Sequence, residues 1–303
     1  MYDGSKYEIL YCDKAGKYAP EQVGGIRTKV IVSGDTLEVE SFPILKNVSA
    51  GARAEAKRRE SSAWMEAANR RNRDKKITRL LEANFTSCDL HMTLTYDYGF
   101  DQRDSMNRLD VIRGYERAGL PFDDDDVRRD LHNYLRRLKR RIRMRGGDPM
   151  KLKYLYVIES TYEPRVDEPE PLPPHYHIHI VIGGVAPLTR DDLETVWGRG
   201  YANADRLDFS QNGLQALAKY LGKGKKFSQR WGHSVGLKQP EVRVTDRAIS
   251  RRRAERVAAD CQAFGREIFE KIYPGYRMTD VQVKYSAFVA GAYIYARLRR
   301  RGT

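Results

Sequence analysis

Residues 174–184 read Pro-His-Tyr-His-Ile-His-Ile-Val-Ile-Gly-Gly and hold three of the six histidines of the chain, at alternate positions. Alternate side chains of a β-strand point to the same face of its sheet, so His175, His177 and His179 would share one face. The opposite row would be built from residues that favour strands: Tyr176, Ile178, Ile180 and Ile182. Neighbouring histidines on one face can reach a single ion, whereas His175 and His179 are too far apart to share it comfortably. The pattern predicts a metal-binding strand, and the simpler alternative is a polar face whose histidines only form hydrogen bonds.

The charge of the chain indicates a polyanionic partner. Lys and Arg number 55 against 41 Asp and Glu among 303 residues, a net charge of +14. The three cysteines, Cys12, Cys88 and Cys261, are too widely spaced for a zinc ribbon or a disulfide framework. Neither the opening residues nor any apolar run resembles a signal peptide or a membrane span, so we expect a cytoplasmic protein with no membrane partner.

The first region, residues 1–84, combines a hairpin with a basic segment. Residues 26–44 alternate around the turn Ser33-Gly34-Asp35, which predicts a β-hairpin. Residues 52–83 are rich in Ala, Arg, Lys and Glu, and predict a long basic helix or helix pair. Such a helix presents either a solvated face or a surface for direct DNA contact.

The middle region, residues 85–235, holds the strands and helices of the expected core. Residues 90–96 and 153–159 predict strands, and an acidic, Pro-rich connection over 163–174 leads from the second of these to the histidines. Glu159 ends an otherwise apolar row, where its carboxylate either caps the strand or faces the metal. Residues 97–122 carry turn signals and short helical pieces.

A helix is predicted from Asp123 to about Arg145. Its acidic start and basic end suit the helix dipole, so the four acids at 123–126 are better explained as a helix start than as a metal site. Its apolar stripe consists of Val127, Leu131, Tyr134, Leu135, Leu138 and Ile142. Basic residues crowd the rest of its surface, Arg137 and Arg141 among them.

Three further elements complete this region. Thr189 and Asp192 form a capping-box pattern at the start of a helix that ends at Trp197. A short strand or irregular segment follows over 202–209. The helix predicted from Gly213 to about Lys223 would present Tyr220 and Lys223 on one face, because they are three positions apart.

The last region, residues 236–303, is expected to pack on the core. It contains a predicted basic helix over 250–272, a turn at Pro274-Gly275-Tyr276 and an aromatic, strand-like end.

Together these residues outline phosphodiester chemistry. A divalent ion can polarise a phosphodiester and neutralise charge that grows on its oxygens. A tyrosine hydroxyl such as that of Tyr220 can attack in line and leave a covalent phosphotyrosine, which conserves the bond energy for rejoining. An enzyme that uses water would not need the tyrosine.

The chain resembles the HUH endonuclease superfamily, and more closely the rolling-circle replication initiator (Rep) proteins of small plasmids and filamentous phages. Residues 90–96 look like the first Rep motif, residues 174–184 like the second, and residues 218–223 like the third, a Tyr-x-x-Lys helix. The stretch 197–207 also resembles the segment that joins the second and third motifs. Three motifs in the right order make the resemblance fairly specific.

The resemblance implies an α+β fold: a ferredoxin-like HUH core whose central antiparallel sheet is flanked by helices. It implies that two histidines and a further ligand, Glu159, bind Mg²⁺ or Mn²⁺. The histidine pair is either His177 with His179, which suits the spacing to the glycines, or His175 with His177. Tyr220 would be the nucleophile that takes the 5′-phosphate, and Lys223 would orient or polarise that phosphate.

The expected partner is single-stranded or hairpin DNA of a replication origin. Its backbone phosphates would contact basic residues of the helices and of the loop after Gly224, namely Lys225, Lys226, Arg230, Arg137 and Arg141. Because the third motif holds one tyrosine, closing the circle would need a second protomer, as in a homodimer, or water or another group. No P-loop motif occurs in the sequence, so unwinding would fall to a helicase of the bacterial host, and copying to a host polymerase.

Several other functions fit part of the pattern. A conjugative relaxase and a single-strand transposase use the same chemistry. A DNA-binding repressor or packaging factor could retain the fold without catalysis, and a metal hydrolase could use water in place of tyrosine.

Overall fold

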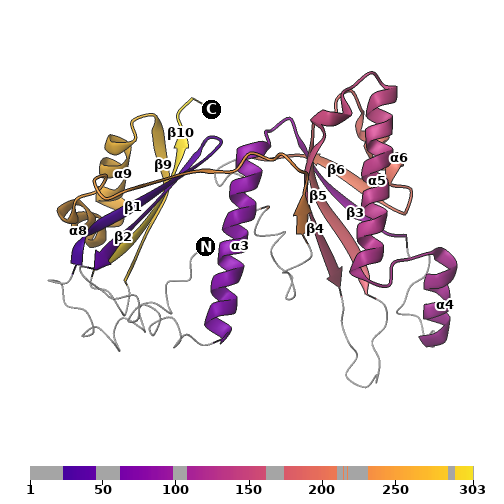
Figure 1. The fold of residues 1–303 in the computed structure, drawn as a ribbon, viewed down its shortest axis with the longest axis horizontal. Coiled ribbons are helices and arrows are strands. Elements are labelled where there is room, and N and C mark those ends of the chain that lie inside the picture. Colours follow the sequence, from indigo (N-terminus) through magenta and orange to yellow (C-terminus); the bar gives the residue numbers. More distant parts are fainter. Residues whose placement is uncertain are drawn as a thin grey trace. The chain divides into compact units, whose positions relative to one another are not determined.

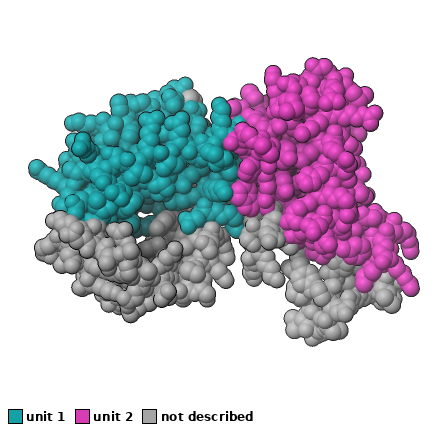
Figure 2. Space-filling model, in the orientation of Figure 1, with its two compact units in different colours: residues 1–84, 238–303 teal, residues 85–237 magenta. Residues whose placement is uncertain are grey.

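The chain has an α+β fold that divides into two compact units (Figure 2). Unit 1 comprises residues 1–84 and 238–303, and unit 2 comprises residues 85–237. A computed structural model describes residues 23–45, 62–97, 108–161, 174–209, 214, 217, 231–285 and 291–302. Each unit contains one five-stranded antiparallel sheet with helices packed against it (Figure 1). No helix in these ranges is long and apolar enough to cross a membrane.

The predicted N-terminal hairpin is confirmed. Strand β1 (Val23–Ser33) pairs in antiparallel register with β2 (Thr36–Leu45). The turn between them places Gly34 at a φ of 57°. A side chain at that position would overlap the backbone carbonyl of Glu82, so the turn requires glycine for space as well as for conformation.

The N-terminal hairpin and the C-terminal region form one sheet. Strand β8 (Glu241–Thr245) pairs with β1, while β10 (Ala292–Arg300) pairs with β2 and with β9 (Tyr276–Tyr285). The strand order is β8-β1-β2-β10-β9. The sequence analysis divided these segments into two regions because the paired strands lie at opposite ends of the chain.

Helices cover both faces of the unit 1 sheet. On one face lie α8 (Arg251–Ala259) and α9 (Cys261–Ile272). The single helix predicted over 250–272 is wrong, because Asp260 adopts extended backbone between them and accepts hydrogen bonds from the first amides of α9. On the other face lies α3 (Ser62–Asn84), the described part of the predicted basic helix, whose Arg79 pairs with Glu38 of β2.

The unit 2 sheet has the order β6-β3-β5-β4-β7. Strands β3 (Leu90–Thr95), β4 (Lys153–Thr161) and β5 (His175–Gly183) confirm the three strands predicted in this region. The short edge strands are β6 (Ala202–Arg206) and β7 (Trp231–His233). Both long neighbours of β5 pair with it over its histidines, so the histidine strand is central to the sheet.

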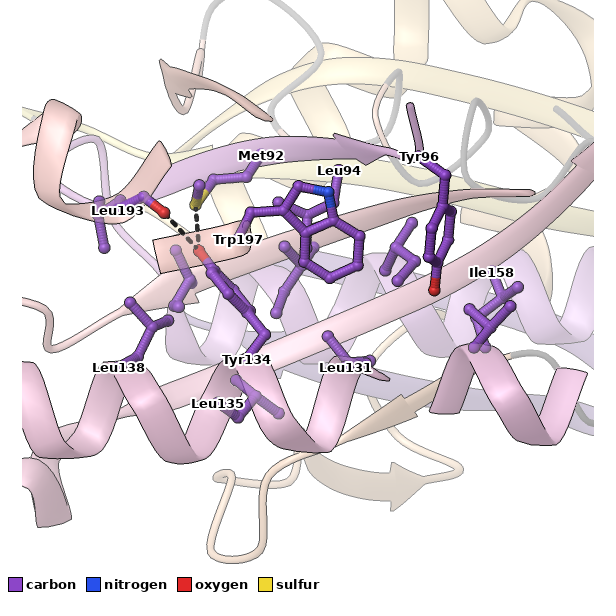
Figure 3. Close-up of a cluster of buried hydrophobic side chains, with 14 of the residues drawn as sticks. Met92, Leu94, Tyr96, Leu131, Tyr134, Leu135, Leu138, Ile158, Leu193 and Trp197 are labelled. Atoms are coloured by element: carbon purple, nitrogen blue, oxygen red, sulfur yellow. Dashed lines mark hydrogen bonds between the residues drawn. The ribbon is translucent and has the colours of Figure 1, made fainter. Parts of the chain in front are cut away.

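One face of this sheet packs against helices to form the core of unit 2 (Figure 3). The helices are α4 (Arg108–Ala118), α5 (Asp124–Met144) and α6 (Arg190–Trp197), and a short 3₁₀ turn (Pro149–Lys151) precedes β4. All six residues of the predicted apolar stripe of α5 are buried. Tyr134, Trp197 and Met92 meet at the centre, where the Tyr134 hydroxyl is 3.4 Å from the Met92 sulfur.

The ends of these helices also agree with the sequence patterns. Asp123 caps α5 by accepting hydrogen bonds from the amides of Asp125 and Asp126, so the four acids begin a helix, as expected. Thr189 and Asp192 form the predicted capping box of α6. These caps fix where α5 and α6 begin above the sheet.

Candidate active site

The histidines of β5 lie on the face of the sheet opposite the helices. Their neighbours Tyr176, Ile178, Ile180 and Ile182 are all buried in the unit 2 core, as the alternation predicts. His179 is only 4 % exposed, whereas His175 and His177 are half-buried. The strand therefore holds a row of imidazoles away from the apolar core.

Two threonines of β3 contact the histidine rings. In the register of the two strands, Thr95 lies opposite His177 and Thr93 lies opposite His179. The hydroxyl oxygens stand 3.3 Å and 3.2 Å from the Nδ1 atoms of these two rings. With Nδ1 facing β3 in both cases, the two Nε2 atoms are the ring nitrogens left to face other ligands.

Glu159 of β4 reaches the histidines from the other side. It lies opposite His177 in the strand register, and its Oε2 atom is 3.2 Å from Nε2 of His179. Its side chain is 33 % exposed, so the carboxylate also remains open to solvent. Of the two alternatives given by the sequence, the contact favours a carboxylate that faces the histidines over one that caps the strand.

The electrostatics of this cluster favour neutral imidazoles. Burial lowers the pKa of His177 and of His179, and the Glu159 carboxylate opposes this effect at both rings. Burial, together with the neighbouring His177, also lowers the pKa of His175. A metal ion binds the neutral form of histidine, so these rings are in the form that coordination requires.

The donor set suits a divalent ion, although the side chains are not already gathered around one point. Two imidazoles and one carboxylate provide the mixed nitrogen and oxygen ligands that Mn²⁺ accepts, with Mg²⁺ preferring the oxygen. Among the residues that the structure describes, no three His, Cys, Asp or Glu side chains already form a metal-binding group. His179 and Glu159 instead form a hydrogen bond with each other, which an ion placed between them would replace.

The contacts also bear on the choice between histidine pairs. His177 and His179 are the two rings held by threonines, and His179 is the ring beside Glu159. His175 lies one pair further along, opposite Thr161 at the end of β4. The arrangement favours His177 with His179, while His175 remains the alternative ligand.

His91 extends the histidine face, and the sequence analysis did not single it out. Its ring stacks on that of His179, with centroids 5.7 Å apart and an interplanar angle of 18°. Burial and the neighbouring His179 lower its pKa to about 4. The signal was present in the sequence, because His91, Thr93 and Thr95 alternate with Met92 and Leu94 in the same way as the residues of β5.

The end of β3 is fixed by the segment that follows α6. The Trp197 indole nitrogen donates to the Thr95 carbonyl at 3.0 Å, and the Thr95 amide donates to the Tyr201 carbonyl at 2.8 Å. Gly200 lies so close to the β3 backbone that a side chain there would overlap the Thr95 carbonyl and the Asp97 amide. This segment therefore positions Thr95, and through it His177.

Two of the predicted DNA-binding residues make contacts within unit 2. Arg137 of α5 donates to the carbonyls of Val196 and Trp197, at 3.0 Å and 2.8 Å, at the end of α6. Arg141 forms an ion pair of 2.9 Å with Asp192. Both guanidinium groups hold α6 on α5, so any contact with DNA would come in addition to this role.

The predicted nucleophile lies outside the described residues. The same is true of Lys223 and of the three basic residues of the loop that follows it, Lys225, Lys226 and Arg230. The roles of Tyr220 and its neighbours stay predictions of the sequence.

Comparison with known proteins links unit 2 to replication proteins. Residues 89–225 match a family model described as a replication-associated protein of the ORF2 type, which supports a Rep-type replication initiator. The matched range is just under half of the chain and includes β3, β4 and β5. No curated protein and no solved structure shows a significant match to the chain.

Proposed function

We propose that this chain nicks and rejoins single-stranded DNA at a replication origin, and so initiates rolling-circle replication. The observation that carries the proposal is the cluster of His177, His179 and Glu159 on the open face of a central sheet. The match to a replication-associated family supports origin DNA as the substrate. A host helicase and polymerase are the proposed partners for the later steps.

His177, His179 and Glu159 would hold a divalent ion, Mn²⁺ or Mg²⁺, with His175 as the alternative ligand. When bound, such an ion polarises the scissile phosphodiester and neutralises charge on its oxygens. Thr93 and Thr95 keep the two rings oriented, and Glu159 supplies the negative charge of the ligand set. Contacts of this kind normally set the affinity and the geometry of a metal site.

The reaction itself is assigned to Tyr220. Its phenolic oxygen would attack the scissile phosphorus in line, forming an ester to the 5′-phosphate as the bond to the 3′ oxygen breaks. The tyrosine proton leaves and a proton is taken up by the departing 3′ oxygen, so the products are a 3′-hydroxyl and a phosphotyrosine. Lys223 would orient the phosphate. Attack by a 3′-hydroxyl on the phosphotyrosine reverses the step and rejoins a strand.

The test is a covalent adduct. The full chain is incubated with Mn²⁺ and overlapping single-stranded oligonucleotides that span the origin, and the protein is separated under denaturing conditions. The proposal expects a protein–DNA adduct that is lost in Tyr220→Phe and kept in Tyr201→Phe, which alters an exposed tyrosine of the same unit. Mapping of the modified peptide should identify Tyr220.

Each other outcome supports a different function. Cleavage without an adduct indicates a hydrolase that uses water, and binding without cleavage indicates a DNA-binding protein. An adduct that forms only on transfer-origin or transposon-end DNA would favour a conjugative relaxase or a single-strand transposase.

A further inference from the structure

The basic residues in the second half of α5 form two sets with different surroundings. Seven Lys and Arg lie between positions 136 and 145, and no Asp or Glu lies among them. Three of the seven contact α6: Arg137 binds its terminal carbonyls, while Arg141 and Arg145 pair with Asp192 at 2.9 Å and 3.2 Å. These three hold two helices of unit 2 together.

The other four form what we call the α5 stripe: Arg136, Lys139, Arg140 and Arg143. Their spacing of i, i+3, i+4 and i+7 places them on one face of the helix. All four are exposed, and they lie opposite the buried residues that face the sheet, such as Leu138 and Ile142. The one partner found for them within the described residues is the neutral side chain of Asn133, which accepts from Arg136 at 2.6 Å.

This arrangement differs from an ordinary solvated helix surface. Earlier in α5, Arg128 and Arg129 pair with Asp125 and Asp126 one turn before them, and in α8 Arg251 pairs with Glu255. Within the α5 stripe, like charges instead stand one turn apart and repel each other, which weakens a helix. The helix dipole favours basic residues only in the last turn. A bound polyanion would remove this repulsion.

The chemistry of the α5 stripe favours the backbone of double-stranded DNA. Proteins that hold a single strand stack its bases on aromatic side chains, and the exposed positions of α5 from His132 onward include no Phe, Tyr or Trp. A row of Lys and Arg without a stacking partner matches phosphates, which are contacted in the same way whatever the sequence. The stripe covers about 10 Å of helix axis at 1.5 Å per residue, the length over which one DNA strand presents about three phosphates.

The position of the stripe makes it a second site. Helix α5 packs on the face of the sheet that carries Ile178 and Ile180, whereas His177 and His179 lie on the opposite face. A strand seated at the histidines is therefore on the other side of the sheet from the stripe. We propose that the α5 stripe binds the phosphate backbone of duplex DNA that flanks the cleaved single strand. The biological role of this contact rests on the proposed function, but the binding itself does not.

The test compares two variants of equal net charge. One replaces the stripe (Arg136→Gln, Lys139→Gln, Arg140→Gln, Arg143→Gln), and the control replaces four exposed basic residues of unit 1 (Arg247→Gln, Arg252→Gln, Arg253→Gln, Lys271→Gln). Fluorescence anisotropy gives the affinity of the full chain for a random-sequence duplex over a salt series. Loss of about three phosphate contacts should lower the slope of log K against log salt by about 2.7 for the stripe variant alone.

The outcomes separate this inference from the proposed function. An unchanged slope, an equal change in the control, or a loss seen with single-stranded but not duplex DNA would each overturn it. A charge-preserving variant, Arg136→Lys with Arg140→Lys and Arg143→Lys, should keep the wild-type slope, which guards against an effect of misfolding. Adduct formation on a short single-stranded oligonucleotide should be unaffected in the stripe variant. If even the wild-type protein forms no adduct, the proposed function fails while the duplex measurement remains decisive for the stripe.

Discussion

Thr95 stands directly opposite His177 in the sheet, and its hydroxyl oxygen lies 3.3 Å from Nδ1 of the imidazole. Thr93 repeats the relationship with His179 at 3.2 Å. An imidazole that donates its Nδ1–H to a hydroxyl keeps the lone pair on Nε2 for a metal ion. The strand β3 therefore does more than complete the sheet, because it sets the orientation of both candidate ligands.

This relationship predicts that removal of the threonine hydroxyls weakens metal binding. We expect Thr93→Val with Thr95→Val to lower the affinity for Mn²⁺ by about 10- to 100-fold, the usual effect of losing a group that orients a ligand. The measurement is calorimetric titration of the metal-free protein. The corresponding Thr→Ser variants should recover most of the affinity, and Thr195→Val, at an exposed position of α6, should change nothing. Wild-type affinity in the double Val variant would rule out the orienting role.

Substitutions of the ligands themselves decide which histidine pair binds. We expect Glu159→Gln, His177→Gln and His179→Gln each to lower Mn²⁺ affinity by more than tenfold, because each removes a direct ligand, whereas orienting groups alone account for about 10-fold or more. His175→Gln should have a much smaller effect, since neither Glu159 nor the two threonines contact it through a described hydrogen bond. If His175→Gln is as damaging as His179→Gln, the pair is His175 with His177.

The local patterns of the sequence predicted most of the elements of unit 2. The alternation of residues 175–182 gave both faces of β5, and the helical spacing of Val127 to Ile142 gave the buried stripe of α5. These predictions succeeded because the period of apolar residues depends on the element in which they lie. The side of the sheet that carries the histidines followed directly.

Features set by distant parts of the chain were not predictable in this way. The pairing of β2 with β10, and the position of Thr95 beside His177, depend on strand register, which no local pattern encodes. The break at Asp260 was missed because the apolar spacing continues across it, although Asp is a common N-cap residue. The relation of Tyr220 to the histidines remains a prediction from the motif.

The capping box of α6 predicts a component of acid unfolding. The Thr189 backbone amide above all, and then the Thr189 hydroxyl and Arg141, lower the pKa of Asp192 to about 2. The carboxylate therefore contributes stability above the ordinary Asp pKa of about 4, which is lost as the pH falls toward 2. We expect urea midpoints of the wild type to fall between pH 5 and pH 3 more steeply than those of Asp192→Asn. Asp191→Asn, which alters the exposed neighbour, should retain the wild-type slope.

Gly200 and Gly198 provide a matched pair for the segment that fixes β3. Both have positive φ angles, 147° and 61°, but only at Gly200 would a side chain meet the β3 backbone. Gly198→Ala should cost about 1–2 kcal/mol for its left-handed conformation. Gly200→Ala should cost at least about 3 kcal/mol, because Thr95 and Asp97 must shift as well. Equal costs, measured by denaturant unfolding, would contradict the proposed close approach.

A buried ion pair holds α3 to the sheet of unit 1. Glu82 of α3 contacts Arg297 of β10, and both side chains are at most 7 % exposed. Burial raises the pKa of Glu82 to about 7, and the positive charge of Arg297 opposes this rise. Removing only one partner of such a pair leaves an uncompensated buried charge, whereas replacing both by apolar residues is often neutral or stabilising.

We therefore predict a strongly non-additive cycle for this pair. Arg297→Met should destabilise unit 1 by about 3–5 kcal/mol, while Glu82→Leu with Arg297→Met should return it to near the wild-type value. Because a raised carboxyl pKa makes the protonated form the stable one, the loss in Arg297→Met should be smaller at pH 5 than at pH 8. Hydrogen exchange of the β10 amides reports on unit 1 separately from unit 2. Additive costs, or a larger loss at pH 5, would show that the pair does not hold α3 in place through its charges.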